Sequence, residues 1–250
     1  MIDWLACTLV KTIGWLFCRL PPAAAVWCGE QLGLLAYWLQ PKRTRIGMIN
    51  VRAAFDGQWT VAQTRQILRN TYRQFGASMI ELLRLPVIDT AYLDRYVAID
   101  GLSHIEHALA SGKPVVFLTG HNGNWELSSI VAALRGFPVV ALARAQNRFP
   151  RLYKLLVAYR ESKGCRIVHK GGAMKQLIEA LEQRQPVGIV GDQASRQGLL
   201  VDFFGRPALF STGPFELAYK TQAFILPVFA HRVRGPFHRI VVEPPIVLVR

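Results

Sequence analysis

The chain is short of acidic residues and of the motifs that mark several common protein classes. It has 16 Asp and Glu residues against 30 Lys and Arg residues, which gives a formal net charge of +14. A surface of this sign attracts acidic partners, such as nucleic acids, anionic lipid head groups and acidic carrier proteins. Because zinc-ligand spacing and aromatic-basic RNA-binding motifs are both missing, nucleic acid is not the expected partner.

Cysteine is equally scarce. The four cysteines lie at positions 7, 18, 28 and 165, and none forms a C-x-x-C pair. This usage is typical of small apolar side chains in a reducing compartment, and not of a disulfide framework. The chain also lacks the G-x-S-x-G motif of serine esterases. We expect neither a metal nor a redox cofactor.

Uninterrupted hydrophobic runs are missing too, although 51% of the residues are hydrophobic. Residues 2–39 come closest, but Lys11, Arg19 and the Pro21-Pro22 pair divide them. Neither half reaches the roughly 20 apolar residues of a membrane-spanning helix. The segment also has no small-residue cleavage site after a basic start, so a signal peptide is not expected.

Tryptophan is concentrated in this segment. Trp4 and Trp15 are eleven positions apart, as are Trp27 and Trp38, and this spacing puts each pair on roughly one helical face. Tryptophan favours membrane interfaces. We therefore predict a membrane-associated helical segment over residues 1–45, with a basic flank at 42–45. The alternative is a pair of helices packed on the protein core.

Residues 46–250 alternate apolar, β-branched runs with helical patterns. This alternation predicts an α/β fold with a mostly parallel central sheet flanked by helices. The expected strands are residues 96–99, 114–119, 137–143, 166–168, 186–190, 223–229 and 240–242. The expected helices are residues 50–85, 102–110, 127–134, 150–163 and 173–182, with a last one capped by Thr212. Thr60 and Gln63 are expected to form a capping box.

The strand at 114–119 runs into the loop GHNGNWE at 120–126, which holds a base, His121, and a carboxylate, Glu126. Ligand sites of α/β sheets gather where strands end. The loop would allow Glu126 to accept a hydrogen bond from one imidazole nitrogen, leaving the other to take a proton. Because no serine or cysteine is placed as a nucleophile, the proton would come from a substrate hydroxyl, as in direct acyl transfer. A histidine bonded for structural reasons is the alternative.

The segment TGHNGNWE resembles the H-x4-D/E block of the glycerophospholipid-type acyltransferase superfamily, in the branch of bacterial lipid A late acyltransferases. Further blocks in the family's order are NVRAAF at 50–55, Glu81, GDQ at 191–193, VDFFGRPA at 201–208, STG at 211–213 and LPVF at 226–229. The resemblance implies a glycerolipid acyltransferase-like fold with His121 and Glu126 as the catalytic pair. It also implies acyl transfer from an acyl carrier protein or CoA thioester to a hydroxyl of a lipid A precursor.

The resemblance further implies a set of substrate-binding residues. Arg144, with Asn147 beside it, and Arg160 would bind a phosphate, either of the carrier's phosphopantetheine or of a glycolipid, because the arginine fork donates two parallel hydrogen bonds. Asp192 would orient Arg144 or the acceptor. Phe203, Phe204 and Gly205 would form the floor of an acyl-chain binding site. The alternative is that the two phenylalanines are simple core aromatics. The remaining implied substrate contacts are Asn124, Gln193 and Thr212.

The expected protein is thus an inner-membrane O-acyltransferase with its catalytic domain on the cytoplasmic face. Its partners would be an acyl carrier protein, an anionic lipid or glycolipid acceptor and the membrane surface. The alternatives are transfer to a phospholipid or another glycolipid, hydrolysis with water as acceptor, and a non-catalytic binding protein. The family extends some tens of residues past a point such as Arg250, so we expect a missing or very short C-terminal segment.

Overall fold

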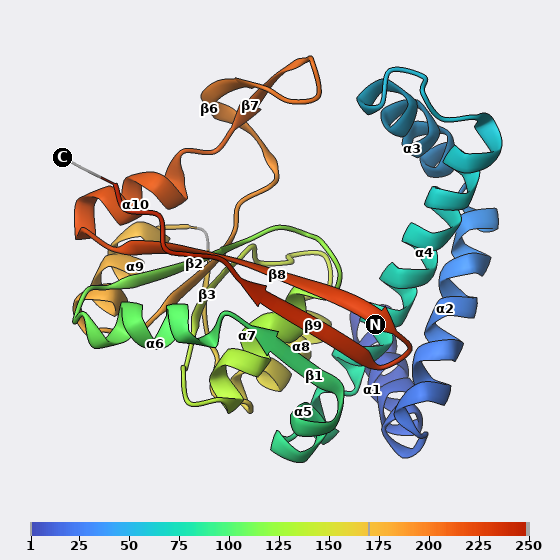
Figure 1. The fold of residues 1–250 in the computed structure, drawn as a ribbon. Helices are drawn as coiled ribbons and strands as arrows, with labels where there is room; N and C mark the ends of the chain where they lie inside the picture. The colour runs from blue at the N-terminus through green and yellow to red at the C-terminus, as the bar shows by residue number, and fades with distance from the viewer. Residues whose placement is uncertain (1, 170, 249–250) are drawn as a thin grey trace.

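The computed structural model describes residues 2–169 and 171–248, so Arg250 lies outside the described residues (Figure 1). The helices are α1 (Ile2–Arg19), α2 (Pro22–Leu39), α3 (Pro41–Ala54), α4 (Val61–Leu83), α5 (Thr90–Tyr96), α6 (Leu102–Ala110), α7 (Trp125–Leu134), α8 (Pro150–Glu161), α9 (Ala173–Glu182) and α10 (Gly213–Thr221), with a 3₁₀ turn η1 (Leu85–Val87). The strands are β1 (Val97–Asp100), β2 (Val115–Thr119), β3 (Val140–Ala143), β4 (Arg166–His169), β5 (Val187–Val190), β6 (Ala194–Asp202), β7 (Pro207–Phe210), β8 (Phe224–Arg234) and β9 (Phe237–Val242).

The central sheet has seven strands in the order β1-β9-β8-β2-β5-β3-β4. Every neighbouring pair is parallel except β8 and β9, which form an antiparallel hairpin. The predicted α/β fold with a mostly parallel sheet is therefore confirmed. As a result, the carboxyl ends of β8, β2, β5 and β3 lie along one edge of the sheet.

The sheet is covered on both faces because alternate residues of a strand point to opposite sides. Val115 and Phe117 of β2 belong to a buried cluster with residues of α5, α6 and α7. Val116, between them, belongs to a second cluster with Leu177 of α9 and Leu217 of α10. Burial on both faces explains why this strand is continuously apolar in the sequence.

The N-terminal helices form a separate layer beside the sheet, in which α2 runs along α4 (Figure 1). Gly29 and Gly33 of α2 make this close contact possible. A Cβ atom on Gly33 would lie 2.0 Å from the carbonyl oxygen of Tyr72, and one on Gly76 of α4 would lie 2.2 Å from that of Gly29. Small residues four apart let two helix backbones approach in this way. This helix contact was not predicted from the sequence.

The outer face of these helices is apolar and exposed. Trp27 and Trp38 are each 61% exposed, and Trp4 and Trp15 are each 54% exposed. Thus α2 packs one face on the protein and leaves its tryptophan face open. No helix within residues 2–169 and 171–248 has the length and apolar character needed to cross a bilayer. The predicted domain boundary after residue 45 falls inside α3.

Some local details differ from the expectations. The predicted helix 50–85 is interrupted between α3 and α4, and Thr60 and Gln63 form the expected capping box at the start of α4. Residues 194–210 form an antiparallel β-hairpin, β6–β7, that the sequence analysis did not predict. Figure 1 shows this hairpin standing away from the central sheet, toward α3. Its nine-residue first strand contains a glycine and polar residues, which obscure the strand pattern.

Candidate functional site

The loop after β2 carries His121 and begins α7. Its two glycines are needed for close packing: a Cβ atom on Gly120 would lie 3.0 Å from a carboxylate oxygen of Asp192, and one on Gly123 would lie 1.8 Å from the carbonyl oxygen of Ala230 in β8. Gly123 also has a φ of +52°, a backbone conformation that residues with a side chain rarely adopt. Asn124 then caps α7 by accepting a hydrogen bond from the amide of Leu127 at 3.3 Å.

His121 is paired with Asp192. Its Nδ1 lies 2.6 Å from Oδ1 of Asp192, and its backbone amide donates to Oδ2 at 2.6 Å. The pairing follows from the sheet order, because β2 and β5 are neighbours with Thr119 opposite Val190, and each residue comes two positions after its strand ends. Asp192 therefore orients His121, and not Arg144 or the acceptor as expected.

This arrangement leaves one imidazole nitrogen for chemistry. A hydrogen bond from Nδ1–H to the carboxylate fixes the tautomer, so the lone pair lies on Nε2. The side chain of Gln193 approaches that atom, with 3.4 Å between the two Nε2 atoms. The side chains of His121 and Asp192 are 35% and 44% exposed, so the pair can be reached from solution. Such a histidine can accept a proton from a bound hydroxyl.

The predicted hydrogen bond between Glu126 and His121 is wrong, because each group has another partner. Glu126, in the first turn of α7, accepts two hydrogen bonds from Arg160 of α8, from Nε at 2.7 Å and from Nη2 at 2.8 Å. Burial lowers the pKa of Arg160, but the hydrogen bond and charge of Glu126 outweigh it, so the pKa is raised. Arg160, predicted to bind a phosphate, is therefore committed to a protein carboxylate.

Other predicted site residues are divided between the rim and the interior. Arg144 and Asn147 are exposed in the loop after β3, at the same sheet edge as His121, where their phosphate-binding role stays a prediction. Asn124 is 1% exposed, and both ends of its amide bind protein groups, Glu81 and Leu127. Asn124 therefore lies buried below the loop and holds protein groups, and its contact with substrate stays a prediction.

The residues of the FFG segment lie at the tip of the β6–β7 hairpin, not in a buried floor. Phe203 and Phe204 are 51% and 53% exposed. Phe204 contacts Phe55, after α3, with ring centroids 5.7 Å apart. Gly205 has a φ of +69° and open space around its Cβ position. Glycine is therefore favoured here by the backbone conformation of the turn, and not by the close approach of another group.

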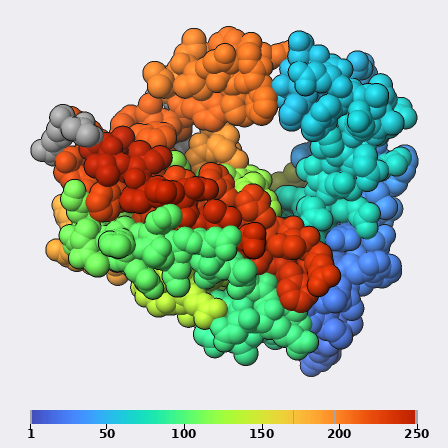
Figure 2. All heavy atoms as spheres, in the orientation of Figure 1, coloured from blue at the N-terminus to red at the C-terminus, as the bar shows by residue number. Residues whose placement is uncertain are grey.

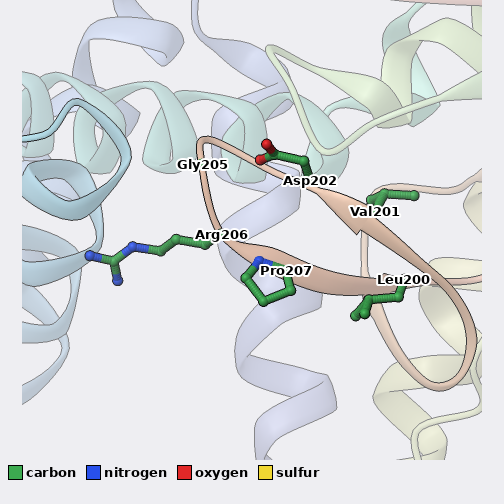
Figure 3. Close-up of a pocket in the computed structure, with 6 residues that line it drawn as sticks. All are labelled: Leu200, Val201, Asp202, Gly205, Arg206 and Pro207. Carbon is green, nitrogen blue, oxygen red and sulfur yellow. The ribbon is translucent and has the colours of Figure 1, made fainter.

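Figure 2 shows the molecule hollowed between this hairpin and helices α3 and α4. A cavity of about 270 Å³ on the hairpin is lined by Leu200, Val201, Asp202, Gly205, Arg206 and Pro207, and Figure 3 shows Arg206 extending away from it. His121 is not among these lining residues. Thr212 stands at the start of α10 as expected, but its hydroxyl donates to Glu216 at 2.5 Å instead of capping the helix.

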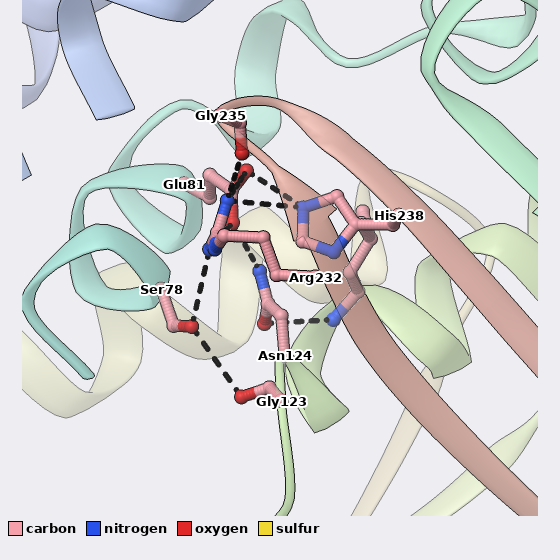
Figure 4. A network of polar contacts seen from close by, with 8 residues as sticks. Ser78, Glu81, Gly123, Asn124, Arg232, Gly235 and His238 are labelled. Carbon is pink, nitrogen blue, oxygen red and sulfur yellow. Dashed lines mark hydrogen bonds and ion pairs between the residues drawn. The ribbon is translucent and has the colours of Figure 1, made fainter. Parts of the chain in front are cut away.

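A buried polar cluster below the loop was not predicted as part of the site. Glu81 of α4 is 2% exposed and binds Arg232 of β8 and His238 of β9, as Figure 4 shows. Burial would raise the pKa of Glu81, but the hydrogen bonds and charges of His238 and Arg232 lower it to about 2. A glutamate inside the apolar stretch MIELL was the available signal, since a buried charge needs a partner.

The family model and the relatives that match this chain are all described as acyltransferases. The family model described as "Bacterial lipid A biosynthesis acyltransferase" matches residues 1–248. A phosphatidylinositol mannoside acyltransferase of Mycobacterium tuberculosis is 32% identical over 160 residues, which cover 61% of this chain and 50% of the relative. The corresponding protein of Mycolicibacterium smegmatis is 28% identical, over 65% of this chain and 55% of the relative.

A lipid A biosynthesis acyltransferase of Haemophilus influenzae is 23% identical over 79% of this chain and 63% of its own length. The chain thus spans about half the length of the mycobacterial relatives that it matches.

Proposed function

Because the chain belongs to the bacterial lipid A biosynthesis acyltransferase family, we propose that it is an O-acyltransferase acting on a glycolipid. It moves a fatty acyl chain from the thioester of an acyl carrier protein, or of CoA, to a hydroxyl of a lipid A precursor in lipopolysaccharide biosynthesis. The observation that carries the proposal is the pairing of Nδ1 of His121 with Asp192 at 2.6 Å in a side chain that is 35% exposed, which leaves Nε2 outside this ion pair.

In the proposed reaction His121 acts as the general base. Its Nε2 takes the proton of the acceptor hydroxyl while the oxygen attacks the thioester carbonyl, forming an ester as the carbon–sulfur bond breaks. The imidazolium then returns the proton to the leaving thiolate. Asp192 holds the imidazole and stabilises its charged form. Glu126 is a positioning residue, because its ion pair with Arg160 joins the start of α7 to α8 next to this loop.

Two features of the surface support the proposed binding partners. The exposed tryptophan face of α1 and α2 supports attachment to a membrane surface, where interfacial helices place such rings. The net charge of +14 supports an anionic glycolipid and an acidic carrier as substrates. We accordingly propose the cytoplasmic face of the inner membrane as the site of action.

Two kinds of glycolipid are suggested by the relatives' names, namely lipid A precursors and phosphatidylinositol mannosides. Both offer sugar hydroxyls and phosphate groups, which suit the base at His121 and the exposed Arg144. We propose the lipid A precursor as the first acceptor to test and the mannoside as the second.

The test is transfer of a radiolabelled acyl group from acyl carrier protein to each acceptor in detergent micelles. Wild type is compared with His121→Ala, and with His107→Ala as a control at an exposed histidine of α6. Labelled glycolipid from wild type and the control, with a loss of several orders of magnitude in His121→Ala, is the expected result. Free fatty acid as the sole labelled product would indicate a hydrolase and overturn the proposal.

A further inference from the structure

The carboxylate of Glu81 is at the centre of the buried cluster shown in Figure 4. Oε1 lies 2.9 Å from Nη1 of Arg232 and 2.9 Å from Nε2 of His238. Oε2 accepts from Nη2 of Arg232 at 2.6 Å and from the side-chain amide of Asn124 at 2.7 Å. Two carboxylate oxygens offer about four acceptor sites, so these four contacts use the full capacity of the group.

The cluster joins four parts of the fold that are distant in sequence. Glu81 comes from α4, Arg232 and His238 come from the two strands of the β8–β9 hairpin, and Asn124 comes from the loop of His121. The side chains of Arg232, His238 and Glu81 are 4%, 0% and 2% exposed. Water is therefore excluded, and any displaced partner would leave a buried polar group unsatisfied.

One side of this cluster faces the loop that carries His121. Asn124 donates to Glu81 and accepts from the first turn of α7, so its amide has a single orientation. Ser78, one turn before Glu81, donates to the carbonyl oxygen of Gly123 at 3.4 Å. Helix α4 therefore contacts the loop at two successive residues, two and three positions after His121.

We infer that Glu81 is a positioning residue for the proposed acyl transfer: its carboxylate fixes Asn124, and Asn124 fixes the loop that presents His121. The inference rests on the proposed function. Glu81 does not touch the imidazole; it acts through the loop backbone. Buried ion pairs contribute little net stability compared with apolar side chains of the same shape, whereas a displacement of about 1 Å in a reacting group can cost about 100-fold in rate.

The first variant is Asn124→Ser. Serine is a good N-cap residue and retains the start of α7, but its side chain is too short to reach Glu81. We expect kcat to fall by about 10- to 100-fold, with KM for the acyl donor within about twofold of wild type. The matched control is Asn70→Ser, the same substitution at an exposed position of α4 outside the cluster; its kcat should stay within about threefold.

A second measurement does not depend on turnover. Hydrogen exchange followed by mass spectrometry should show at least about tenfold faster exchange of the backbone amides in 120–127 for Asn124→Ser, with peptides of β2 and β8 unchanged. Glu81→Gln, which keeps the shape but removes two acceptor positions, should change the same segment. If Glu81→Gln prevents folding, the exchange and kcat of Asn124→Ser alone test the positioning role of Glu81.

The outcomes separate the two proposals. Unchanged kcat and unchanged exchange in Asn124→Ser, or an equal loss of kcat in Asn70→Ser, would overturn the positioning role of Glu81. Absence of turnover by wild type on every acceptor would overturn the proposed function, while exchange in 120–127 would still show whether Glu81 holds the loop.

Discussion

Replacing Asp192 by asparagine should separate the two bonds that His121 makes to this side chain. Each carboxylate oxygen accepts one donor of His121, the backbone amide and Nδ1–H, both at 2.6 Å. Asparagine offers only one acceptor oxygen, and its other end is a donor. One of the two bonds must therefore be lost, and whenever the amide group faces Nδ1 the imidazole adopts the tautomer that cannot act as a base.

Asparagine in the equivalent position of a catalytic serine triad lowers kcat by about 10⁴-fold. Here both side chains are more than one-third exposed, so water replaces part of the lost interaction, and we expect kcat to fall by about 10²- to 10³-fold. That corresponds to about 3–4 kcal/mol of transition-state stabilisation. The assay is the initial rate of acyl transfer at saturating donor between pH 6 and 9.

Asp100→Asn is the matched control, because Asp100 is half-exposed, pairs with Arg239 and is the last residue of β1, whose carboxyl end lies at the opposite edge of the sheet. A rate for Asp192→Asn within threefold of the control would refute the reasoning that Asp192 fixes the tautomer of His121.

Three further predictions concern packing, membrane binding and pH. Gly33→Ala should lower the free energy of unfolding by about 1–3 kcal/mol in denaturant titrations, whereas Gly14→Ala, whose new Cβ would have its nearest contact at 3.4 Å, should not; equal effects would contradict the close helix contact. Replacing Trp27 or Trp38 by alanine should weaken co-sedimentation with anionic vesicles by about 50-fold each, from about 100 Å² of lost apolar contact; unchanged binding would place the membrane contact elsewhere. The pKa of Glu81 is lowered from 4.5 to about 2, so its contribution of about 3 kcal/mol to the free energy of unfolding is complete above pH 4.5 and is lost as the pH falls toward 2. The free energy of unfolding measured across that range should depend less on pH in Glu81→Gln than in wild type. Identical pH profiles of the two proteins would contradict the assignment.

The sheet was predictable because its strands are short, apolar and separated by glycine, proline and helical patterns. Helices α6 and α9 have the bounds expected from their apolar spacing, and β2 differs by one residue. The β6–β7 hairpin was missed because β6 contains a glycine and polar residues, and its consecutive Leu199 and Leu200, both exposed, do not alternate with polar residues. The contact between α2 and α4 was missed for a related reason: glycines four apart carry no hydrophobic signal.

The site could be predicted in part. Strand-end reasoning correctly put His121 at the edge of the sheet, but its pairing with Asp192 depends on β2 and β5 being neighbours, which strand order alone decides. Glu126 is five positions from His121 in sequence, yet its helix turns it toward Arg160. Nearness in sequence therefore misled the choice of partner, and the sequence-distant Asp192 was overlooked in that role.

In the proposed reaction His121 takes a proton from a glycolipid hydroxyl during acyl transfer. The most direct test of this step is single-turnover transfer from labelled acyl carrier protein to a lipid A precursor, with wild type and His121→Ala at equal concentrations and across pH. We expect labelled glycolipid from wild type and a loss of several orders of magnitude in the variant. Labelled glycolipid formed at the same rate by both proteins would contradict this role of His121.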